Sequence, residues 1–291
     1  MAPPKKQRTG TEMGIEEKII FEDDDYAVVN KDSGMLSIPD RYNKDLPNVY
    51  DMLTEKYGKI FIVHRLDKDT SGVIVFAKNP EAHRDLSVRW EEGGVSKTYF
   101  ALVTGRFDEA QGNINLPIGP LKKKKGVMVI DKRNGKDAFT SYKVLEKYRE
   151  YTYLEVTPKT GRTHQIRVHL AAIGHPLAVD PLYNRKEAIL NLGRKEDEKE
   201  EPQNFRKKKD KSRKPKISKE KLEKIRKQAE DAAKLAPVIG RLPLHAGKIR
   251  FLHYRTNQFV EIEAPMPKDM SSTLDILSLQ SFFMNKERNK N

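Results

Sequence analysis

The chain has 291 residues, of which 34% are charged, and its formal net charge at pH 7 is +14. It contains no cysteine, which excludes disulfides, thiol nucleophiles, zinc–thiolate sites and cysteine-ligated iron–sulfur clusters. No apolar run approaches the ~20 residues that span a bilayer, and the N-terminus lacks the apolar segment of a signal peptide. We therefore expect a soluble cytoplasmic protein. Its surplus of cations favours a polyanionic partner (RNA, DNA or an anionic membrane) or forms a solvated basic surface.

The N-terminal region changes character near Lys18. Residues 1–15 are basic and have no periodic apolar pattern, which predicts a flexible basic tail. Beyond Lys18, residues 19–21 and 26–29 are short β-prone runs separated by an acidic turn at 22–25. Further strands are expected at 72–78, 97–104, 127–131, 139–145, 151–157, 248–254 and 259–263.

Two features of these strands predict the sheet. One strand places Thr152, Leu154 and Val156 on a single face, which suits a sheet with two unlike faces. Short turns at 147–150 and 255–258 join neighbouring strands, so much of the sheet should be antiparallel.

Two helices are expected between the strands. The first begins at the Asn-Pro pair at 79–80, ends at the glycine pair at 93–94, and turns Leu86 and Trp90 toward the core. The second has Thr163 as its N-cap and three apolar residues on one face before its stop at Gly174; these are Ile166, Leu170 and Ile173. Strands with interspersed helices and no strict βαβ alternation indicate an α+β fold.

Residues 185–236 have few apolar positions and predict a charged, Lys-rich insertion. Its basic run at 206–219 holds nine Lys or Arg, and apolar residues at 222–235 recur at helical spacing. We expect a mobile excursion that ends in an amphipathic helix and either holds RNA backbone or serves as a solubilising loop. A single domain, residues 16–184 and 237–285, is therefore interrupted rather than ended.

The densest group of reactive side chains is His-Arg-Leu-Asp-Lys-Asp-Thr-Ser-Gly at 64–72, just before an apolar strand. A loop that leads into a buried strand is a common place for reactive groups, because the strand holds them rigidly. Asp67 is a candidate nucleophile, a candidate general base, or a turn residue that caps Asp69 or Thr70. Composition alone favours the turn.

Two further segments carry candidate binding groups. Around the second helix, Arg162, His164 and Gln165 are candidate donors to phosphate or base edges at a helix N-terminus. Arg167 follows an apolar residue, so a buried guanidinium there needs a carboxylate partner, and the alternative is a structural ion pair. On the strand at 97–104, Tyr99 shares a face with Lys97 and Ala101. Tyr99 is a candidate to stack on a base or to donate a hydrogen bond. Considered alone, a tyrosine at this position is expected to fill the core.

Together these three segments resemble the RluA-type family of RNA pseudouridine synthases, from about Ile19 to Leu277 apart from the insertion. The matching segments are 64–72, the Lys97–Tyr99–Ala101 strand, 161–170, 174–177, 180–183, 244–246 and 264–267. The chain departs from the family pattern at Asp32, where proline is expected, at Ala178 and Val179 before Asp180, and at Asn184. Many relatives carry an S4-type RNA-binding domain, and the short segment before Ile19 leads us to expect none here.

The resemblance implies a pseudouridine synthase fold: a long, mostly antiparallel mixed sheet flanked by helices and loops, with the RNA cleft across it. It implies an isomerisation that breaks the N1–C1′ bond of a uridine and rejoins the uracil through C5, with no cofactor and no metal. The absence of Walker A, dinucleotide and zincin patterns from the sequence agrees with this. We expect a monomer that acts on ribosomal RNA or, second, transfer RNA, with no obligatory protein partner.

The resemblance also implies roles for single residues. Asp67 is the essential carboxylate, which either attacks C1′ or removes a sugar proton; Arg167 orients it, and Tyr99 stacks on the uracil and assists proton transfer near C5. Arg65 fills the gap left by the flipped nucleotide. The remaining expected RNA-binding residues are His64, Thr70, Lys97, Arg162, Thr163, His164 and Gln165. Two alternatives are a non-catalytic RNA-binding or ribosome-assembly protein and a hydrolase in which Asp69 supplies a second carboxylate.

Overall fold

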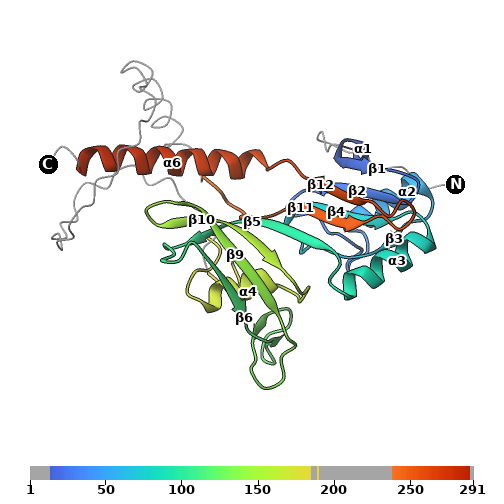
Figure 1. The fold of residues 1–291 in the computed structure, drawn as a ribbon, viewed down its shortest axis with the longest axis horizontal. Helices are drawn as coiled ribbons and strands as arrows, with labels where there is room; N and C mark the ends of the chain where they lie inside the picture. The colour runs from blue at the N-terminus through green and yellow to red at the C-terminus, as the bar shows by residue number, and fades with distance from the viewer. Residues whose placement is uncertain (1–13, 185–188, 190–237, 289–291) are drawn as a thin grey trace, which may run out of the picture.

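The computed structural model describes residues 14–184, 189 and 238–288 (Figure 1). The helices are α1 (Ile15–Lys18), α2 (Val49–Tyr57), α3 (Pro80–Glu91), α4 (Gln165–Ala172) and α6 (Lys268–Arg288). The strands are β1 (Ile19–Glu22), β2 (Tyr26–Lys31), β3 (Phe61–Ile62), β4 (Ser71–Ala77), β5 (Ser96–Thr104), β6 (Gln111–Asn115), β7 (Ile118–Pro120), β8 (Met128–Ile130), β9 (Phe139–Lys147), β10 (Tyr151–Pro158), β11 (Leu244–Leu252) and β12 (Phe259–Glu263). None of the described helices is long and apolar enough to cross a membrane.

The strands confirm the predicted α+β class. Ten of them form one sheet, whose main path is β1-β2-β4-β11-β5-β10-β9-β6, with β3 paired to β4 and β12 to β11. Among the described strands only β4 and β11 pair in parallel, so the sheet is mixed and mostly antiparallel, as expected. In Figure 1 the sheet crosses the molecule, with α3 beside its N-terminal half and α4 beside the β9–β10 half.

The register at the centre of the sheet determines where its loops meet. Gly72 of β4 lies beside Ala246 of β11, Ala246 beside Tyr99 of β5, and Tyr99 beside Val156 of β10. β4 therefore starts at the level where β10 ends, and the loop before β4 meets the loop after β10. Gly72 is required for this row: its φ is +112°, and a Cβ there would lie 2.1 Å from the Ala246 carbonyl oxygen.

Local signals predicted several elements well. Asn79 caps α3 by accepting the Ala82 N–H, Leu86 is fully buried, and Gly93 follows the helix with φ +79°. The turns between β9 and β10 and between β11 and β12 join antiparallel partners, as predicted. β11 begins at Leu244, four residues before the predicted strand, because its first half pairs with β5 and β4.

The expected tail and insertion lie largely outside the described residues, as does the amphipathic helix expected at 222–235. Within the expected tail, Ile15 is the first residue of α1 and packs against the core. Near the start of the expected insertion, Ile189 is buried and exchanges backbone hydrogen bonds with residues 238–239. α6 packs on the same apolar cluster through Met270 and Leu277.

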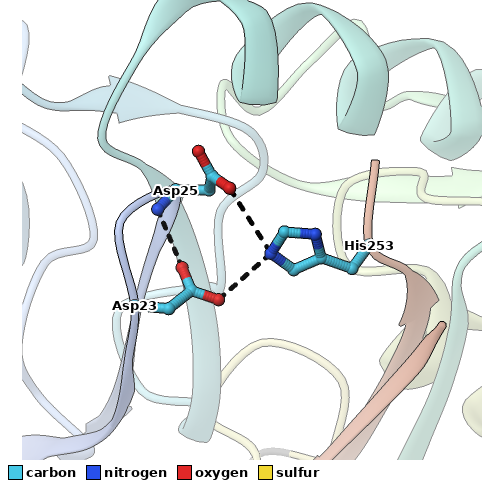
Figure 2. Close-up of side chains that lie close together, drawn as sticks. All are labelled: Asp23, Asp25 and His253. Carbon is cyan, nitrogen blue, oxygen red and sulfur yellow. Dashed lines mark hydrogen bonds and ion pairs between the residues drawn. The ribbon is translucent and has the colours of Figure 1, made fainter. Parts of the chain in front are cut away.

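The acidic turn between β1 and β2 is pinned to the turn after β11 (Figure 2). The Nδ1 atom of His253 accepts the backbone N–H of Arg255, so in the neutral ring Nε2 carries the proton and donates to Asp23 at 3.1 Å. Asp25 is 2% exposed and accepts from Arg255, Asn79 and Tyr254. Asp23, Asp25 and His253 lie close enough to hold a metal ion, but their polar atoms are already paired. They join the β1–β2 turn at one edge of the sheet to the turn after the central strand β11.

Because hydrogen bonding to Arg255 is the main cause that lowers the pKa of Asp25 from 3.8 to about 2, this carboxylate stabilises the fold fully above about pH 4. The stabilisation is lost as the pH falls from about 4 toward about 2. We expect Asp25→Asn to lower the free energy of unfolding at neutral pH by about 1–3 kcal/mol. Thermal unfolding of the wild type and the variant across this pH range measures the difference in stability. A difference that is as large at the lowest pH as at neutral pH would contradict the role of the Asp25 charge.

Candidate active site

One cavity of about 280 Å³ opens where the loop before β4, the middle of β5 and the loop before α4 meet. Every site residue expected from the sequence lines it except Thr163. The expected residues in its wall are His64, Arg65, Asp67, Thr70, Lys97, Tyr99, Arg162, His164, Gln165 and Arg167. Three segments that are far apart in the sequence are thus brought together.

The Asp67 carboxylate takes no part in the hydrogen bond that closes its turn. The backbone carbonyl of Asp67, not its side chain, closes the turn by accepting the Thr70 N–H at 3.1 Å. The carboxylate is 27% exposed and faces α4: Oδ2 lies 3.8 Å from Nη1 of Arg167 and 3.9 Å from Nε2 of His164. Of the alternatives open from sequence, the geometry thus favours a chemically available carboxylate over a capping residue.

The loop that carries Asp67 is held by a buried lysine. Lys31 is fully buried, and its ammonium donates to the backbone carbonyls of Asp32, Met35 and Lys68 at 2.7–2.8 Å. Burial lowers the pKa of Lys31 to about 7, against the opposing effect of nearby carboxylates. Ser37 adds a second anchor, because its hydroxyl bonds both the N–H and the carbonyl of Leu66. The residues on either side of Asp67, Leu66 and Lys68, are therefore both anchored by hydrogen bonds.

Arg167 has the carboxylate partner that its burial requires. Its Nε and Nη2 donate to the two oxygens of Asp180, each at 2.8 Å, and Asp180 is fully buried. Asp180 also accepts the backbone N–H groups of Leu182 and Tyr183. Burial alone lowers the pKa of Arg167, yet the pKa is raised because Asp180 bonds the charged form. Asp180 thus fixes the orientation of the guanidinium, and its remaining nitrogen, Nη1, faces Asp67.

Tyr99 projects into the same cavity from the centre of the sheet. Burial is the main cause that raises the pKa of its phenol, and the charge of Asp67 adds to it, so the ring is neutral at physiological pH. Within the described part of the chain its hydroxyl makes no hydrogen bond, and it is not sealed from the cavity. A neutral phenol beside a carboxylate can stack on a base and exchange a proton.

His164 is held as a hydrogen-bond donor toward Asp67. It precedes α4 in a left-handed conformation with φ +56°, which is uncommon for a non-glycine residue and clusters at functional sites. Nε2 of His164 faces the Asp67 carboxylate, which favours the proton on Nε2, so Nδ1 accepts from the Tyr183 hydroxyl at 2.8 Å. The same hydroxyl accepts the Met128 N–H at 3.0 Å. Burial is the main cause that lowers the pKa of His164, so the ring is neutral, with its proton on Nε2 beside Asp67.

We expect Tyr183→Phe to remove the preference of His164 for the Nε2-protonated tautomer. Without the Tyr183 hydroxyl, Nδ1 of His164 loses its donor, and both neutral tautomers become populated. Nitrogen NMR of the imidazole in the labelled protein reports this directly: the wild type shows an Nε2-protonated ring and the variant a mixture. An unchanged Nε2-protonated ring in the variant would show that the Tyr183 hydroxyl does not fix the tautomer of His164.

One sequence prediction around α4 is wrong. Thr163 is not the N-cap: α4 begins one residue after His164, and Thr163 is exposed and outside the cavity wall. The turn is closed instead by Gln165, whose carbonyl oxygen accepts from Thr160 and from the Arg162 N–H. The amide nitrogen of Gln165 donates to Phe139 and Thr140, and only 4% of the residue is exposed. Since both ends of its amide have protein partners, Gln165 fixes the turn, and its contact with RNA stays a prediction.

The departures from the family pattern are accommodated locally. Asp32, where proline is expected, forms an ion pair with Lys18. Asn184 donates from its amide to the backbone carbonyls of Leu177 and Ala178 and so holds the segment before Asp180. Neither change touches the cavity.

Four structurally important residues were not singled out from the sequence as site residues: Lys31, Trp90, Asp180 and Tyr183. Asp180 had an indirect signal, because a buried Arg167 requires an anion. Trp90 was assigned to the core from its helical spacing; it is half-buried and also lines the cavity.

Comparison with known proteins agrees with this geometry. A family model described as RNA pseudouridylate synthase matches residues 25–172. The uncharacterized RNA pseudouridine synthase YlyB of Bacillus subtilis is 34% identical over 89% of this chain and 72% of its own length. Ribosomal large subunit pseudouridine synthase D of Nitrosomonas europaea is 35% identical over 89% of this chain and 65% of its own. Dual-specificity RNA pseudouridine synthase RluA of Pasteurella multocida is 40% identical over 57% and 76%.

Solved structures support the fold. The human RNA pseudouridylate synthase domain containing 4 protein superposes with a TM-score of 0.60 at 23% identity, over 91% of this chain and 94% of that one. The human domain containing 1 protein gives 0.57 at 24% identity, over 86% and 83%. The chain belongs to the RluA-type family of RNA pseudouridine synthases, which are isomerases acting on RNA.

Proposed function

We propose that this enzyme converts specific uridines in structured RNA to pseudouridine with Asp67 as its essential carboxylate. The observation that supports this best is the Asp67 side chain, which is free of its turn and faces Arg167 in the cavity that also holds Tyr99. In the reaction the N1–C1′ bond breaks and a C5–C1′ bond forms. N1 gains a proton and C5 loses one, so the reaction is balanced without an oxidant or a water molecule.

Each polar group has a place in this scheme. Asp67 either attacks C1′ or removes a sugar proton, and both routes need the ionised carboxylate that Arg167 orients. Tyr99 stacks on the uracil and passes a proton near C5. Arg65 is exposed at the cavity mouth, where it can occupy the space left in the RNA when the uridine flips. We propose that Thr70 and Arg162 contact the RNA from the same wall.

The substrate we favour is large-subunit ribosomal RNA, with transfer RNA second. The net charge of +14 supports a large polyanion, and relatives are named for the ribosomal large subunit or as dual-specificity enzymes. Flipping a base costs a few kcal/mol and less in loops, so a uridine in a structured loop is the expected target. We further propose that the enzyme works as a cytoplasmic monomer without a cofactor.

Two other functions make different predictions. A hydrolase needs a second carboxylate near the first, but Asp69 is exposed and is not part of the cavity wall. A non-catalytic RNA-binding protein has no use for a carboxylate fixed beside a guanidinium inside a cavity. The geometry therefore favours the synthase over both.

Transcripts with tritium at C5 of uridine test the proposal. A synthase releases tritium to water and leaves the nucleoside count unchanged, because C5 exchanges its hydrogen for the sugar. Tritium release without free uracil is the expected result. Free uracil would indicate the hydrolase, and salt-sensitive RNA binding with neither product would indicate the non-catalytic protein.

A further inference from the structure

One corner of the cavity holds a lysine, a tryptophan and a histidine in contact. Lys97 is 9% exposed, and its ammonium lies 4.9 Å from the ring centroid of Trp90. The His64 ring stacks on Trp90 with centroids 4.2 Å apart and an interplanar angle of 23°. All three residues line the cavity wall.

The Lys97 ammonium lacks an anionic partner. Across the described residues no carboxylate lies within 4.0 Å of it, and no acceptor is within hydrogen-bonding distance; the ammonium faces the Trp90 ring. Burial lowers the pKa of Lys97, which reflects this missing compensation. An unpaired buried cation destabilises a fold, so its presence beside an active-site cavity points to an anion that arrives with the substrate.

The other side chains of this corner are also donors. His64 accepts the Val75 N–H at Nε2, and burial, followed by the charge of Lys97, lowers its pKa to about 3. The neutral ring therefore carries its proton on Nδ1. The indole N–H of Trp90 is a donor only. In the described structure neither N–H is paired, and neither is among the fully sealed polar atoms. A set of donors without an acceptor fits an anion better than a base edge.

The cavity wall beside this corner carries a glycine, Gly161. A Cβ placed on Gly161 would meet the Trp90 indole nitrogen at 4.0 Å, so a larger side chain there would fill the space in front of the indole N–H. Tyr99 lies on the same face of β5 as Lys97, about 7 Å further along the strand. That spacing is of the order of the distance between a nucleobase and the phosphates of its own nucleotide.

We propose that Lys97, Trp90 and His64 form a phosphate subsite that binds an RNA phosphodiester next to the uridine held between Asp67 and Tyr99. The proposal rests on the proposed function of the cavity. Trp90 and His64 orient the lysine and complete the donor set, and Lys97 supplies the charge. A phosphate fixed there sets how deeply the flipped nucleotide enters.

The test is the binding of a short single-stranded RNA with one uridine between flanking adenosines. Trp90 is the only tryptophan of the chain, so its fluorescence reports occupancy of the corner. We expect Lys97→Met to weaken binding about fivefold to tenfold at low salt and to reduce the slope of log Kd against log salt by about 0.7. Lys97→Arg should keep the slope. The control is Lys59→Met, since Lys59 lies 5.1 Å from the Phe61 ring centroid, outside the cavity wall, and should change neither value.

Neutral methylphosphonate linkages locate the phosphate. Replacing the linkage on the 5′ or the 3′ side of the uridine should weaken wild-type binding at one of the two positions. At that position Lys97→Met should show no further loss. If both linkages affect wild type and variant equally, the subsite is wrong.

Stability separates this role from a structural one. Lys97→Met removes an unpaired buried charge, so we expect an unfolding temperature equal to or above that of the wild type. A lower unfolding temperature with an unchanged salt slope would show that Lys97 supports the fold and would overturn the proposal. Because binding is measured without product formation, failure of the subsite and failure of the proposed isomerisation are distinguishable.

Discussion

Replacing Asp180 with alanine should lower the free energy of unfolding by about 3–5 kcal/mol. Asp180 is fully buried, accepts both forks of Arg167, and also accepts two backbone N–H groups. Its loss leaves the Arg167 guanidinium, whose side chain is 5% exposed, without its hydrogen-bonded counter-ion, and the remaining carboxylate of Asp67 is 3.8 Å away. Urea unfolding followed by circular dichroism measures the difference, and a loss below about 1 kcal/mol would contradict the buried pair.

A double variant separates stability from activity at this pair. Arg167→Met with Asp180→Leu replaces the two charges by apolar groups of similar size, which is often neutral for stability. We expect the double variant to recover most of the stability lost in Asp180→Ala. It should remain inactive, because Asp67 then faces no guanidinium. Recovery of both stability and activity would show that Arg167 serves the fold alone.

Replacing Asp67 with asparagine should reduce the rate of pseudouridine formation by at least about 10⁴-fold and leave the fold intact. Asparagine keeps the size of the side chain but can neither attack C1′ nor take a sugar proton. The Asp67 carboxylate is 27% exposed, and its nearest charged partner is 3.8 Å away, so stability should change by less than about 1 kcal/mol. Single-turnover tritium release gives the rate, and thermal unfolding gives the stability.

Asp69→Asn is the matched control for Asp67→Asn. Asp69 has the same side chain two residues further along the same loop, is exposed, and lies outside the cavity wall. We expect its activity to stay within about twofold of the wild type, as for a surface substitution. Loss of activity in Asp69→Asn, or its retention in Asp67→Asn, would reassign the carboxylate.

The parts of the fold that the sequence predicted have strong local signals. Asn79 with Pro80 marks the start of α3, because the cap and the first helical turn need no distant partner. α2 was not predicted, since only Val49 and Leu53 of its residues are buried and the apolar period is short. β6 was missed for a similar reason: Ile114 is its one buried residue.

The active site divides in the same way. Asp67, Tyr99 and Arg167 were expected from the resemblance, and the structure brings them into one cavity. Thr163 was misplaced because a threonine before a helix normally caps it, whereas here the side chain of Gln165 closes the turn.

Contacts between segments that are far apart in the sequence could not be predicted from it. Lys31 holds the carbonyl of Lys68 across 37 residues. No spacing rule predicts such contacts, since they depend on the order of strands in the sheet.

We propose above all that this chain forms pseudouridine and that Asp67 does the chemistry. The most direct measurement incubates unmodified total RNA with the wild type and with Asp67→Asn and maps pseudouridines by chemical labelling. We predict new sites with the wild type and none with the variant, and the positions of those sites identify the RNA substrate. Equal sites with both proteins would contradict the role of Asp67, and no new sites with either protein would contradict the proposed activity.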